Sequence, residues 1–358
     1  MNECRAGVPD RIEALQQWAK LNKVPLNATF ELTPLCNFSC VMCYVHLTRE
    51  QMESQGKMLS GKQWLEIAKQ AKELGTLNVC ITGGEPFVHP DFWEIYSELN
   101  KMGFLISIMS NGALIDEGVI EKFTRYGMPY SIKLTVYGAS DETYMRVCKS
   151  PDGFTRVSKA IDLIKQAGVP CKLTSTIVRE NADDLQNIYN FARKKGLPLI
   201  HTISIVKSSR GAETTPAKSR FAFSDFQEEL SLADLEKSKF PPLKSPFARC
   251  ASYGNSFWMA WDGKMQACAF MNTPCADFTG SLKASWNELQ EKISRIKNPA
   301  ECEACEWQSF CQRCPGILCA ESGSPEKVSN DLCLAAKRLY EIYKGKKVFG
   351  NEEEIRET

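Results

Sequence analysis

The chain has 358 residues, of which 43% are hydrophobic and 24% charged, with sixteen cysteines and a formal net charge of +1. This is the composition of a globular protein with one large domain or two ordinary ones. Because the net charge is close to zero, electrostatic attraction gives no reason to expect nucleic acid or an anionic membrane as the main partner. Residues 1–20 are polar, and no apolar run approaches the length that spans a bilayer, so we expect a cytoplasmic protein.

Helices and strands alternate along the first 206 residues. The hydrophobic pattern predicts helices at 10–22, 61–75, 91–103, 116–127, 153–168 and 183–196, and strands at 27–34, 78–82, 104–110, 131–138, 171–178 and 197–206. In the second of these helices the apolar side chains fall on one face, namely Trp64, Ile67, Ala68, Ala71 and Leu74. Six β-α units are two short of a closed barrel, so we expect a partial (β/α)6 TIM-like barrel of the α/β class. Its functional loops should follow the strands.

The remaining chain has a different character. We divide it into an N-terminal helical segment (1–26), the barrel (27–206), a linker (207–248), a small cysteine-rich domain (249–345) and a charged tail (346–358). The linker is rich in small residues and proline, with one helix expected at 224–238. Nine of the sixteen cysteines fall between residues 250 and 333. Clustered cysteines in a reducing compartment hold metal or do redox work more often than they form disulfides, and zinc is one alternative.

Three cysteines follow the first predicted strand, in LTPLCNFSCVMCYVHL (residues 32–47). Cys36, Cys40 and Cys43 have the spacing Cys-x3-Cys-x2-Cys, and His46 is the one further ligand at short range. A structural zinc site needs four ligands, and an iron–sulfur cube normally takes four thiolates. Three thiolates would leave one iron open to a substrate or cofactor.

This spacing resembles the signature of the radical S-adenosylmethionine (radical SAM) superfamily. The resemblance implies a [4Fe–4S] cluster whose open iron binds the amino and carboxylate groups of SAM. It also implies reductive cleavage of SAM to methionine and a 5′-deoxyadenosyl radical, which takes a hydrogen atom from substrate.

Further motifs of that family follow in order. They are GGEP (83–86) after the second strand, SNG (110–112) after the third, and KLTVYGAS (133–140) at the fourth. By resemblance, the expected SAM-binding residues are Tyr44, Gly83, Gly84, Glu85, Ser110, Asn111, Thr135 and Arg146. Three of these assignments have a purely structural alternative. GGEP could be a simple turn, Thr135 a plain strand residue, and Arg146 a solvated charge on a helix.

The C-terminal cysteines form a second pattern, Cys-x12-Gly-x4-Cys, then Cys-x2-Cys-x5-Cys-x2-Cys, then a distant cysteine. It resembles the SPASM domain, which carries auxiliary [4Fe–4S] clusters in radical SAM maturases of peptides and proteins. The resemblance implies one cluster on Cys302, Cys305, Cys311 and Cys333, and a second on Cys250, Cys268 and Cys314, with Cys275 or Cys319 as possible fourth ligand. Thus three clusters are expected in all.

This chain departs from the SPASM pattern in two places. The family usually has three residues between the third and fourth cysteines of the central run, whereas this chain has two, Gln312 and Arg313. No cysteine lies a few residues before Cys250. Outside both patterns, Cys4, Cys80, Cys148 and Cys171 are interpreted as incidental thiols.

The resemblance implies oxidative modification of a peptide by a thioether or carbon–carbon cross-link. Alternatives are a formylglycine-forming sulfatase maturase, a small-molecule dehydrogenase and, outside enzymes, a multi-cluster electron carrier or a zinc-ribbon module. Sulfatase-maturing relatives place an Asp after the cysteine equivalent to Cys268, where this chain has Ala269. We expect a peptide or protein substrate and an electron donor such as flavodoxin or ferredoxin. About 26 residues precede the first strand, so we expect leader recognition to come from the linker, to come from a separate leader-binding protein, or not to exist. The sequence assigns no catalytic acid or base.

Overall fold

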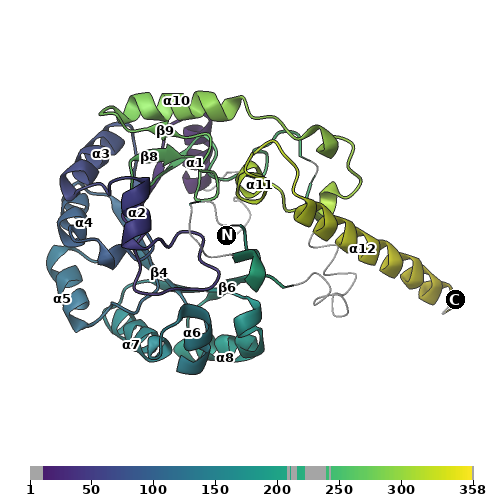
Figure 1. The fold of residues 1–358 in the computed structure, drawn as a ribbon, viewed down its shortest axis with the longest axis horizontal. Coiled ribbons are helices and arrows are strands. Elements are labelled where there is room, and N and C mark those ends of the chain that lie inside the picture. Colours follow the sequence, from purple (N-terminus) through teal and green to yellow (C-terminus); the bar gives the residue numbers. More distant parts are fainter. Residues whose placement is uncertain (1–10, 208–209, 211–215, 222–238, 242, 357–358) are drawn as a thin grey trace, which may run out of the picture.

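The larger part of the molecule is a ring of helices around parallel strands (Figure 1). The computed structural model describes residues 11–207, 210, 216–221, 239–241 and 243–356. The barrel strands are β1 (Asn27–Glu31), β2 (Asn78–Thr82), β3 (Leu105–Ser110), β4 (Ser131–Thr135), β5 (Cys171–Thr176) and β6 (Leu199–Thr202). The helices of this part are α1 (Arg11–Leu21), α2 (Arg49–Gln55), α3 (Gly61–Glu73), α4 (Phe92–Lys101), α5 (Glu117–Tyr126), α6 (Asp141–Cys148), α7 (Gly153–Gln166) and α8 (Leu185–Lys195), with short 3-10 turns η1 (Pro86–Val88) and η2 (Arg179–Asp184).

The six barrel strands pair in parallel, each with the next in chain order. Their register aligns Phe30 with Ile81, Ile81 with Ile108, and Ile108 with Ile132. These four side chains are all buried completely. The predicted partial (β/α)6 barrel is therefore confirmed, and the ends of its parallel strands meet on one side.

Apolar side chains between the strands and the helix ring form the core. The predicted face of α3 is confirmed at Trp64, Ile67, Ala68 and Ala71, which are fully buried, while Leu74 is half-buried. The ring of Trp64 packs on that of Phe30 with 5.1 Å between centroids. Burying a large apolar side chain contributes about 1.5–3 kcal/mol, so contacts of this kind hold the strand ends in place.

The first strand is shorter than predicted. It ends at Glu31 instead of residue 34, because the next segment turns to meet the loop after β2. There the Thr33 carbonyl accepts the N–H of Gly84 at 2.6 Å. The strands predicted at 131–138 and 197–206 likewise end early, at Thr135 and Thr202.

The C-terminal region continues the barrel sheet. β7 (Ser256–Met259) pairs in parallel with β1, and β8 (Lys264–Gln266) and β9 (Ala276–Asp277) follow in antiparallel order, giving nine strands among the described residues. β7 thus covers the edge of β1 that would otherwise lie unpaired. The boundary at residue 249 stays a prediction.

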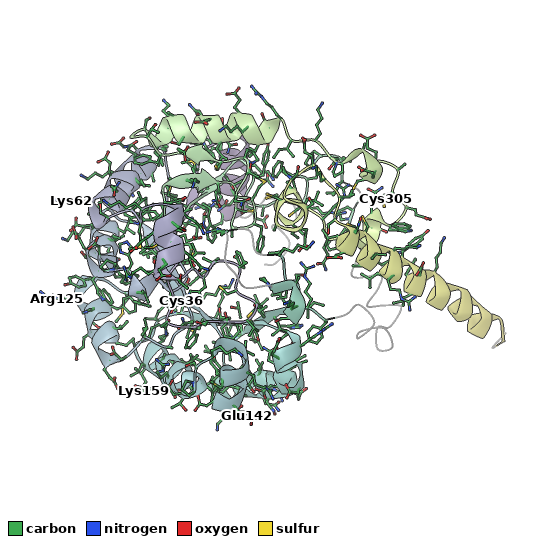
Figure 2. All side chains as sticks on the ribbon, in the orientation of Figure 1. Cys36, Lys62, Arg125, Glu142, Lys159 and Cys305 are labelled. Atoms are coloured by element: carbon green, nitrogen blue, oxygen red, sulfur yellow. The ribbon has the colours of Figure 1, made fainter. Side chains whose placement is uncertain are left out.

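The remaining helices of the described residues lie mainly in the C-terminal region. They are α10 (Leu282–Ser294), α11 (Pro315–Ser322) and α12 (Asn330–Arg356), with 3-10 turns η3 (Pro216–Ser219), η5 (Ala300–Cys302) and η6 (Gln308–Phe310). α10 lies against α3, and α12 projects away from the ring (Figure 1). The predicted tail at 346–358 is helical as far as Arg356, and the helix predicted at 224–238 lies outside the described residues. In Figure 2, Cys36 lies within the ring and Cys305 in the part beyond it.

Candidate active site

Cys36, Cys40 and Cys43 occupy the loop that follows β1. Two main-chain hydrogen bonds fasten this loop to the end of α6. The N–H of Ser39 donates to the Cys148 carbonyl at 3.0 Å, and the N–H of Val41 donates to the Val147 carbonyl at 2.9 Å. The loop is therefore anchored from both its strand and a helix far away in the sequence.

Backbone donors point at two of the three sulfurs. The N–H of Phe38 donates to the Cys36 sulfur at 3.4 Å, and the N–H of His46 donates to the Cys43 sulfur at 3.3 Å. Hydrogen bonds to sulfur favour the thiolate, which is the form that binds metal.

Burial acts in the opposite direction on the same thiols. It raises the pKa of Cys36 well above its usual range and the pKa of Cys43 to about 11. The pKa of Cys40 is also raised, first by a hydrogen bond to the neighbouring Cys148 sulfur and then by burial. The three thiols are therefore protonated in the metal-free protein and would release protons on binding metal. Cys148, interpreted from sequence as incidental, proves to be a direct neighbour of this cluster.

Gly83 and Gly84 lie against the main chain that leads to the first cysteine. A Cβ on Gly83 would stand 2.6 Å from the Thr33 carbonyl oxygen, and one on Gly84 would clash with the Leu35 carbonyl oxygen. Only glycine permits this crossing of two backbones. The glycines thus fix the β2 loop beside the cysteine loop.

Glu85 is a fully buried carboxylate held by the end of β3. Its Oε1 accepts the Ser110 hydroxyl at 2.9 Å, and its Oε2 accepts the Asn111 N–H at 2.9 Å. Burial raises the pKa of Glu85 to about 7, although these donors and the Phe87 N–H oppose the rise. The pKa of Glu85 therefore lies close to neutral pH.

The Asn111 side chain connects this carboxylate to the cysteine loop. Its Nδ2 donates to Asn37 Oδ1 at 2.8 Å and lies 3.6 Å from the Cys36 sulfur. The structure thus brings together Cys36, Glu85, Ser110 and Asn111 from the ends of three adjacent strands.

Thr135 and Tyr44 lie on other sides of the barrel mouth. The Thr135 hydroxyl, at the end of β4, lies 3.4 Å from that of Thr174 on β5. The Tyr44 ring lies 5.3 Å from that of Phe270. Burial raises the pKa of the Tyr44 phenol, and the charges of Cys43 and Cys268 add to that rise. Tyr44 therefore stands between the first cysteine cluster and a C-terminal cysteine.

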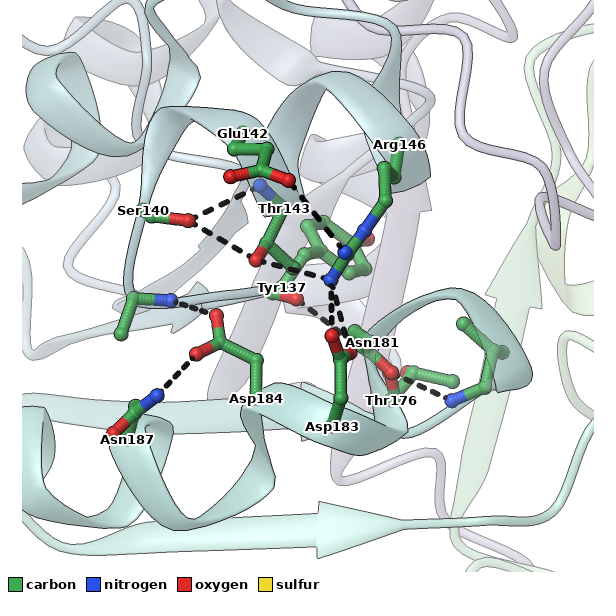
Figure 3. Close-up of polar contacts among 12 residues, drawn as sticks. Tyr137, Ser140, Glu142, Thr143, Arg146, Thr176, Asn181, Asp183, Asp184 and Asn187 are labelled. Carbon is green, nitrogen blue, oxygen red and sulfur yellow. Dashed lines mark hydrogen bonds and ion pairs between the residues drawn. The ribbon is translucent and has the colours of Figure 1, made fainter.

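Arg146 is directed elsewhere. On α6, its Nη2 donates to both carboxylate oxygens of Asp183 at 2.9 Å, and its Nη1 lies 3.9 Å from Glu142 (Figure 3). The structure does not bring Arg146 into the group around Glu85. A role for Arg146 in binding a SAM carboxylate stays a prediction.

The turn η2 fixes the loop that follows β4. Asn181 donates through Nδ2 to the Tyr137 carbonyl at 2.8 Å and to the Thr176 carbonyl at 3.1 Å. Asp184 accepts the Ala139 N–H at 2.6 Å (Figure 3). These side chains tie the β4 and β5 loops together at the barrel mouth.

Glu31 is a buried carboxylate that the sequence interpretation did not single out. Glu31 is fully buried at the end of β1. Its Oε2 accepts a hydrogen bond from Arg210 and another from the Trp258 indole N–H at 2.8 Å. Its Oε1 has no hydrogen-bond partner among the described residues. Arg210 also donates to the Ala269 carbonyl at 3.1 Å, which links the barrel interior to the loop after Cys268.

The strand pattern contained a signal for this residue. Ala28 and Phe30 are the apolar, outward-facing residues of β1, so Glu31 falls on the inward face with Thr29. A charged residue facing the inside of a barrel next to a cysteine motif is a candidate functional residue.

The four cysteines predicted to hold one auxiliary cluster line one small cavity with Arg313; they are Cys302, Cys305, Cys311 and Cys333. Burial raises the pKa values of Cys302, Cys311 and Cys333. The Arg313 guanidinium offsets part of the rise at each of the three. The structure therefore brings this predicted ligand set together.

The second C-terminal set gathers around α11. Burial raises the pKa of Cys268 to about 11, and the charges of Cys314 and Cys250 raise it further. A Cβ on Gly316 would lie 2.8 Å from the Cys268 sulfur and 3.9 Å from the Cys314 sulfur. A glycine is therefore needed where these sulfurs approach the helix.

The two possible fourth ligands are engaged differently. The Cys319 sulfur lies 3.4 Å from both Asn272 Oδ1 and the Thr273 carbonyl oxygen. Burial and the nearby Asp277 carboxylate raise the pKa of Cys275. The fourth ligand of this set stays a prediction.

The donor sets fit iron–sulfur clusters. Among the residues that the structure describes, no three Cys, His, Asp or Glu side chains converge closely enough to hold a single metal ion. A cube does not require such convergence, because each of its irons takes its own thiolate. The chain offers three thiols on the loop after β1 and seven in the C-terminal region near α11 and α12. These numbers are consistent with one thiolate per iron.

Known proteins share these features. Residues 30–192 match the family model described as "Radical SAM superfamily". The PqqA peptide cyclase of Granulibacter bethesdensis is 30% identical over 172 residues, which is 48% of this chain and 45% of that protein. The chain thus spans about half the length of this curated relative.

Two solved structures share the fold over most of the chain. Streptococcus suis SuiB bound to precursor peptide SuiA gives a TM-score of 0.65 at 18% identity, covering 93% of this chain and 83% of that one. The protein anSMEcpe with bound AdoMet and Kp18Cys peptide gives 0.62 at 16% identity, covering 92% and 99%. At such identities the likeness establishes the fold.

A partial barrel with three cysteines after its first strand, matched by the family model, defines a radical SAM domain. Residues 30–192 thus form a domain of the radical SAM superfamily, a family of enzymes that use SAM and a [4Fe–4S] cluster. None of the helices in the described part of the chain is both long and apolar enough to cross a membrane.

Proposed function

We propose that this enzyme oxidatively modifies a peptide, forming a thioether or carbon–carbon cross-link. The observation that carries the proposal is the contact of Tyr44, next to Cys43, with Phe270, two residues after Cys268. This contact supports the proposal because it joins the loop after Cys43 to the loop after Cys268. A substrate there could lose both a hydrogen atom and an electron.

In this proposal Cys36, Cys40 and Cys43 hold the cluster that binds SAM. Bound SAM, when cleaved reductively, supplies a 5′-deoxyadenosyl radical that removes a substrate hydrogen atom. The residues around it orient SAM: the main chain of Gly83 and Gly84 and the Glu85 carboxylate toward its amino group, Ser110 and Asn111 toward its ribose, Thr135 and Arg146 toward its carboxylate, and Tyr44 toward adenine. Glu85 suits an ammonium, since a buried carboxylate makes strong charge-assisted hydrogen bonds.

The C-terminal cysteines hold two further clusters in this proposal, three in all. Closing a cross-link from a substrate radical releases one electron and one proton. Cys250, Cys268 and Cys314, and the set Cys302, Cys305, Cys311 and Cys333, would hold clusters able to accept that electron. A donor such as flavodoxin or ferredoxin would supply the electron that SAM cleavage requires.

The choice of a peptide rests on the relatives. The cyclase is named for the PqqA peptide, SuiB was solved with a precursor peptide, and anSMEcpe was solved with a peptide. Three different relatives that share domain or fold with this chain are thus each associated with a peptide.

Conversion of a Cys or Ser side chain to formylglycine is the second candidate. Ala269 removes the base expected directly after Cys268. However, Arg210 bridges the Ala269 carbonyl to the Glu31 carboxylate, whose Oε1 has no partner among the described residues. This carboxylate from β1 is a candidate replacement for the base, and it is the observation that favours the second function.

The test is anaerobic reconstitution followed by reaction with peptides. The protein is loaded with iron and sulfide, mixed with SAM and dithionite, and incubated with short peptides encoded beside its gene and with a Cys-containing sulfatase peptide. We expect a gene-neighbour peptide to lose two hydrogen atoms by mass spectrometry. Formylglycine in the sulfatase peptide alone would favour the second function, and reaction of neither peptide despite 5′-deoxyadenosine release would contradict both.

A further inference from the structure

Arg313 is a buried cation at the four-cysteine cavity. It is 5% exposed and lines the same cavity as Cys302, Cys305, Cys311 and Cys333. Its Nη1 donates to the neutral Asn298 Oδ1 at 3.0 Å. Among the described residues it makes no ion pair with a carboxylate.

A buried charge requires a partner of opposite sign. Burying an ammonium or guanidinium group without a counter-charge costs several kcal/mol, on the order of the stability of a whole domain. The groups that share the cavity with Arg313 include the side chains of Cys302, Cys305, Cys311 and Cys333. The four thiolates of a bound cluster would supply the missing counter-charge.

A second arginine reaches the same cysteines from the other side. Arg249 donates through Nη1 to the Cys311 carbonyl at 2.8 Å, and its guanidinium stacks on Phe240 at 4.6 Å. Arg249 is only partly buried and contacts the backbone, so Arg313 is the cation inside the cavity.

From this arrangement we infer that Arg313 raises the reduction potential of the cluster held by Cys302, Cys305, Cys311 and Cys333, making that cluster the terminal acceptor of the substrate's electron. The inference rests on the proposed function, which places an iron–sulfur cluster at these cysteines. Reduction adds one negative charge to the cluster. A fixed positive charge beside it stabilises the reduced form more than the oxidised form, and net charge and hydrogen bonding are the main determinants of these potentials.

The location of the four-cysteine cavity suits the last acceptor in a chain of electron transfers. Cys305 and Cys333 are half-buried, so the cluster would lie close to solvent, whereas Cys268 lies two residues before Phe270, whose ring contacts Tyr44. An electron leaving substrate would therefore travel from the barrel to the better acceptor near the surface. The cation sits at a position where this chain departs from the SPASM spacing, in the shortened Gln312–Arg313 insert.

The test is a redox titration of the reconstituted full chain, followed by electron paramagnetic resonance. The signal of the four-cysteine cluster is identified as the one lost in Cys305→Ala. We expect Arg313→Gln to shift the midpoint of that signal to lower potential, Arg313→Lys to shift it less, and Gln312→Ala, the exposed neighbour, to leave it unchanged. The midpoints of the other clusters serve as internal references.

The outcomes separate this inference from the proposed function. Iron counts reduced by about four per chain in Cys305→Ala, with an unchanged midpoint in Arg313→Gln, would overturn the role of Arg313 alone. A Gln312→Ala shift as large as that of Arg313→Gln would do the same. Loss of about four irons in both Arg313 variants would reassign the residue to cluster assembly. Absence of any iron dependent on Cys305 would instead contradict the proposed function.

Discussion

Tyr44 packs on Phe270 with 5.3 Å between their ring centroids. Tyr44 directly follows Cys43, the last cysteine of the loop after β1, and Phe270 lies two residues after Cys268. The sheet explains why two segments so distant in sequence meet. β7 pairs with β1, so the chain re-enters the barrel beside the strand that carries the first cysteines. The fold therefore brings the loops that follow Cys43 and Cys268 into contact.

Gly84→Ala should disrupt the first cysteine loop. The added methyl group would meet the carbonyl oxygens of Pro34 and Leu35, which are backbone atoms and cannot move aside cheaply. Overpacking of this kind costs about 1–3 kcal/mol, and here the loop before Cys36 must shift. We expect loss of about four irons per chain together with loss of SAM cleavage.

The matched control is Gly118→Ala, where the nearest atom to the new Cβ is a side-chain oxygen at 3.4 Å. It should retain iron and activity. Full iron content in Gly84→Ala would show that the crossing of the two loops is not required to hold the cluster.

Gly316→Ala should act on the second C-terminal set alone. Its Cβ would stand 2.8 Å from the Cys268 sulfur, so cluster binding there should fail while SAM cleavage continues. Iron analysis and assay of 5′-deoxyadenosine measure the two effects separately. Gly345→Ala, also in a helix and with no atom within 4 Å of the new Cβ, is the control. Equal iron in both variants would count against a cluster at Cys268.

Removing Arg210 should destabilise the barrel. Arg210→Ala leaves the fully buried Glu31 charge without its cation, which typically costs about 3–5 kcal/mol. The double variant Glu31→Gln with Arg210→Met removes both charges and should lose less. Urea unfolding gives both values. Arg295→Ala breaks an exposed pair with Glu291 and should cost at most about 1 kcal/mol. A cost for Arg210→Ala as small as this would mean that the buried pair does not stabilise the fold.

Glu85 should make the stability of the metal-free protein depend on pH. Its folded pKa, about 7, lies above the usual 4.5, so the folded state binds the proton more tightly. The resulting stabilisation is full below about pH 4.5 and is lost as the pH rises through about 7, a change on the order of 3 kcal/mol.

This dependence is measured as the difference in unfolding free energy between wild type and Glu85→Gln from pH 4.5 to 8. The difference should fall as pH rises. The exposed Glu94→Gln serves as control and should give a difference that stays flat. A flat difference for Glu85→Gln as well would show that the hydrogen bonds from Ser110 and Asn111 fully offset the effect of burial on the pKa.

Local patterns predicted most of the barrel because each unit buries its own apolar face. Strand and helix positions followed from periodicity, as the buried face of α3 shows at Trp64 and Ile67. Strand ends were predicted less well. The end of β1 depends on a contact between Thr33 and Gly84 that is distant in sequence.

Pairings between distant segments could not be predicted from the sequence. No local pattern shows that β7 joins β1, that Cys148 lies beside Cys40, or that Arg210 meets Glu31. The resemblance of the cysteine pattern to known families predicted that Cys302, Cys305, Cys311 and Cys333 would lie together, and they line one cavity. The charges and glycines that surround the cysteines could be identified only from the fold. Arg146 is the opposite case. The resemblance predicted a contact of Arg146 with SAM, and in the structure its side chain forms an ion pair with Asp183.

The most direct test of the central claim is SAM cleavage by the anaerobically reconstituted protein. With dithionite as reductant, we expect about twelve irons per chain and release of 5′-deoxyadenosine. Cys40→Ala should lose about four irons and all release, while Cys305→Ala should still cleave SAM. A protein that binds zinc in place of iron, or that holds iron but forms no 5′-deoxyadenosine, would contradict the account.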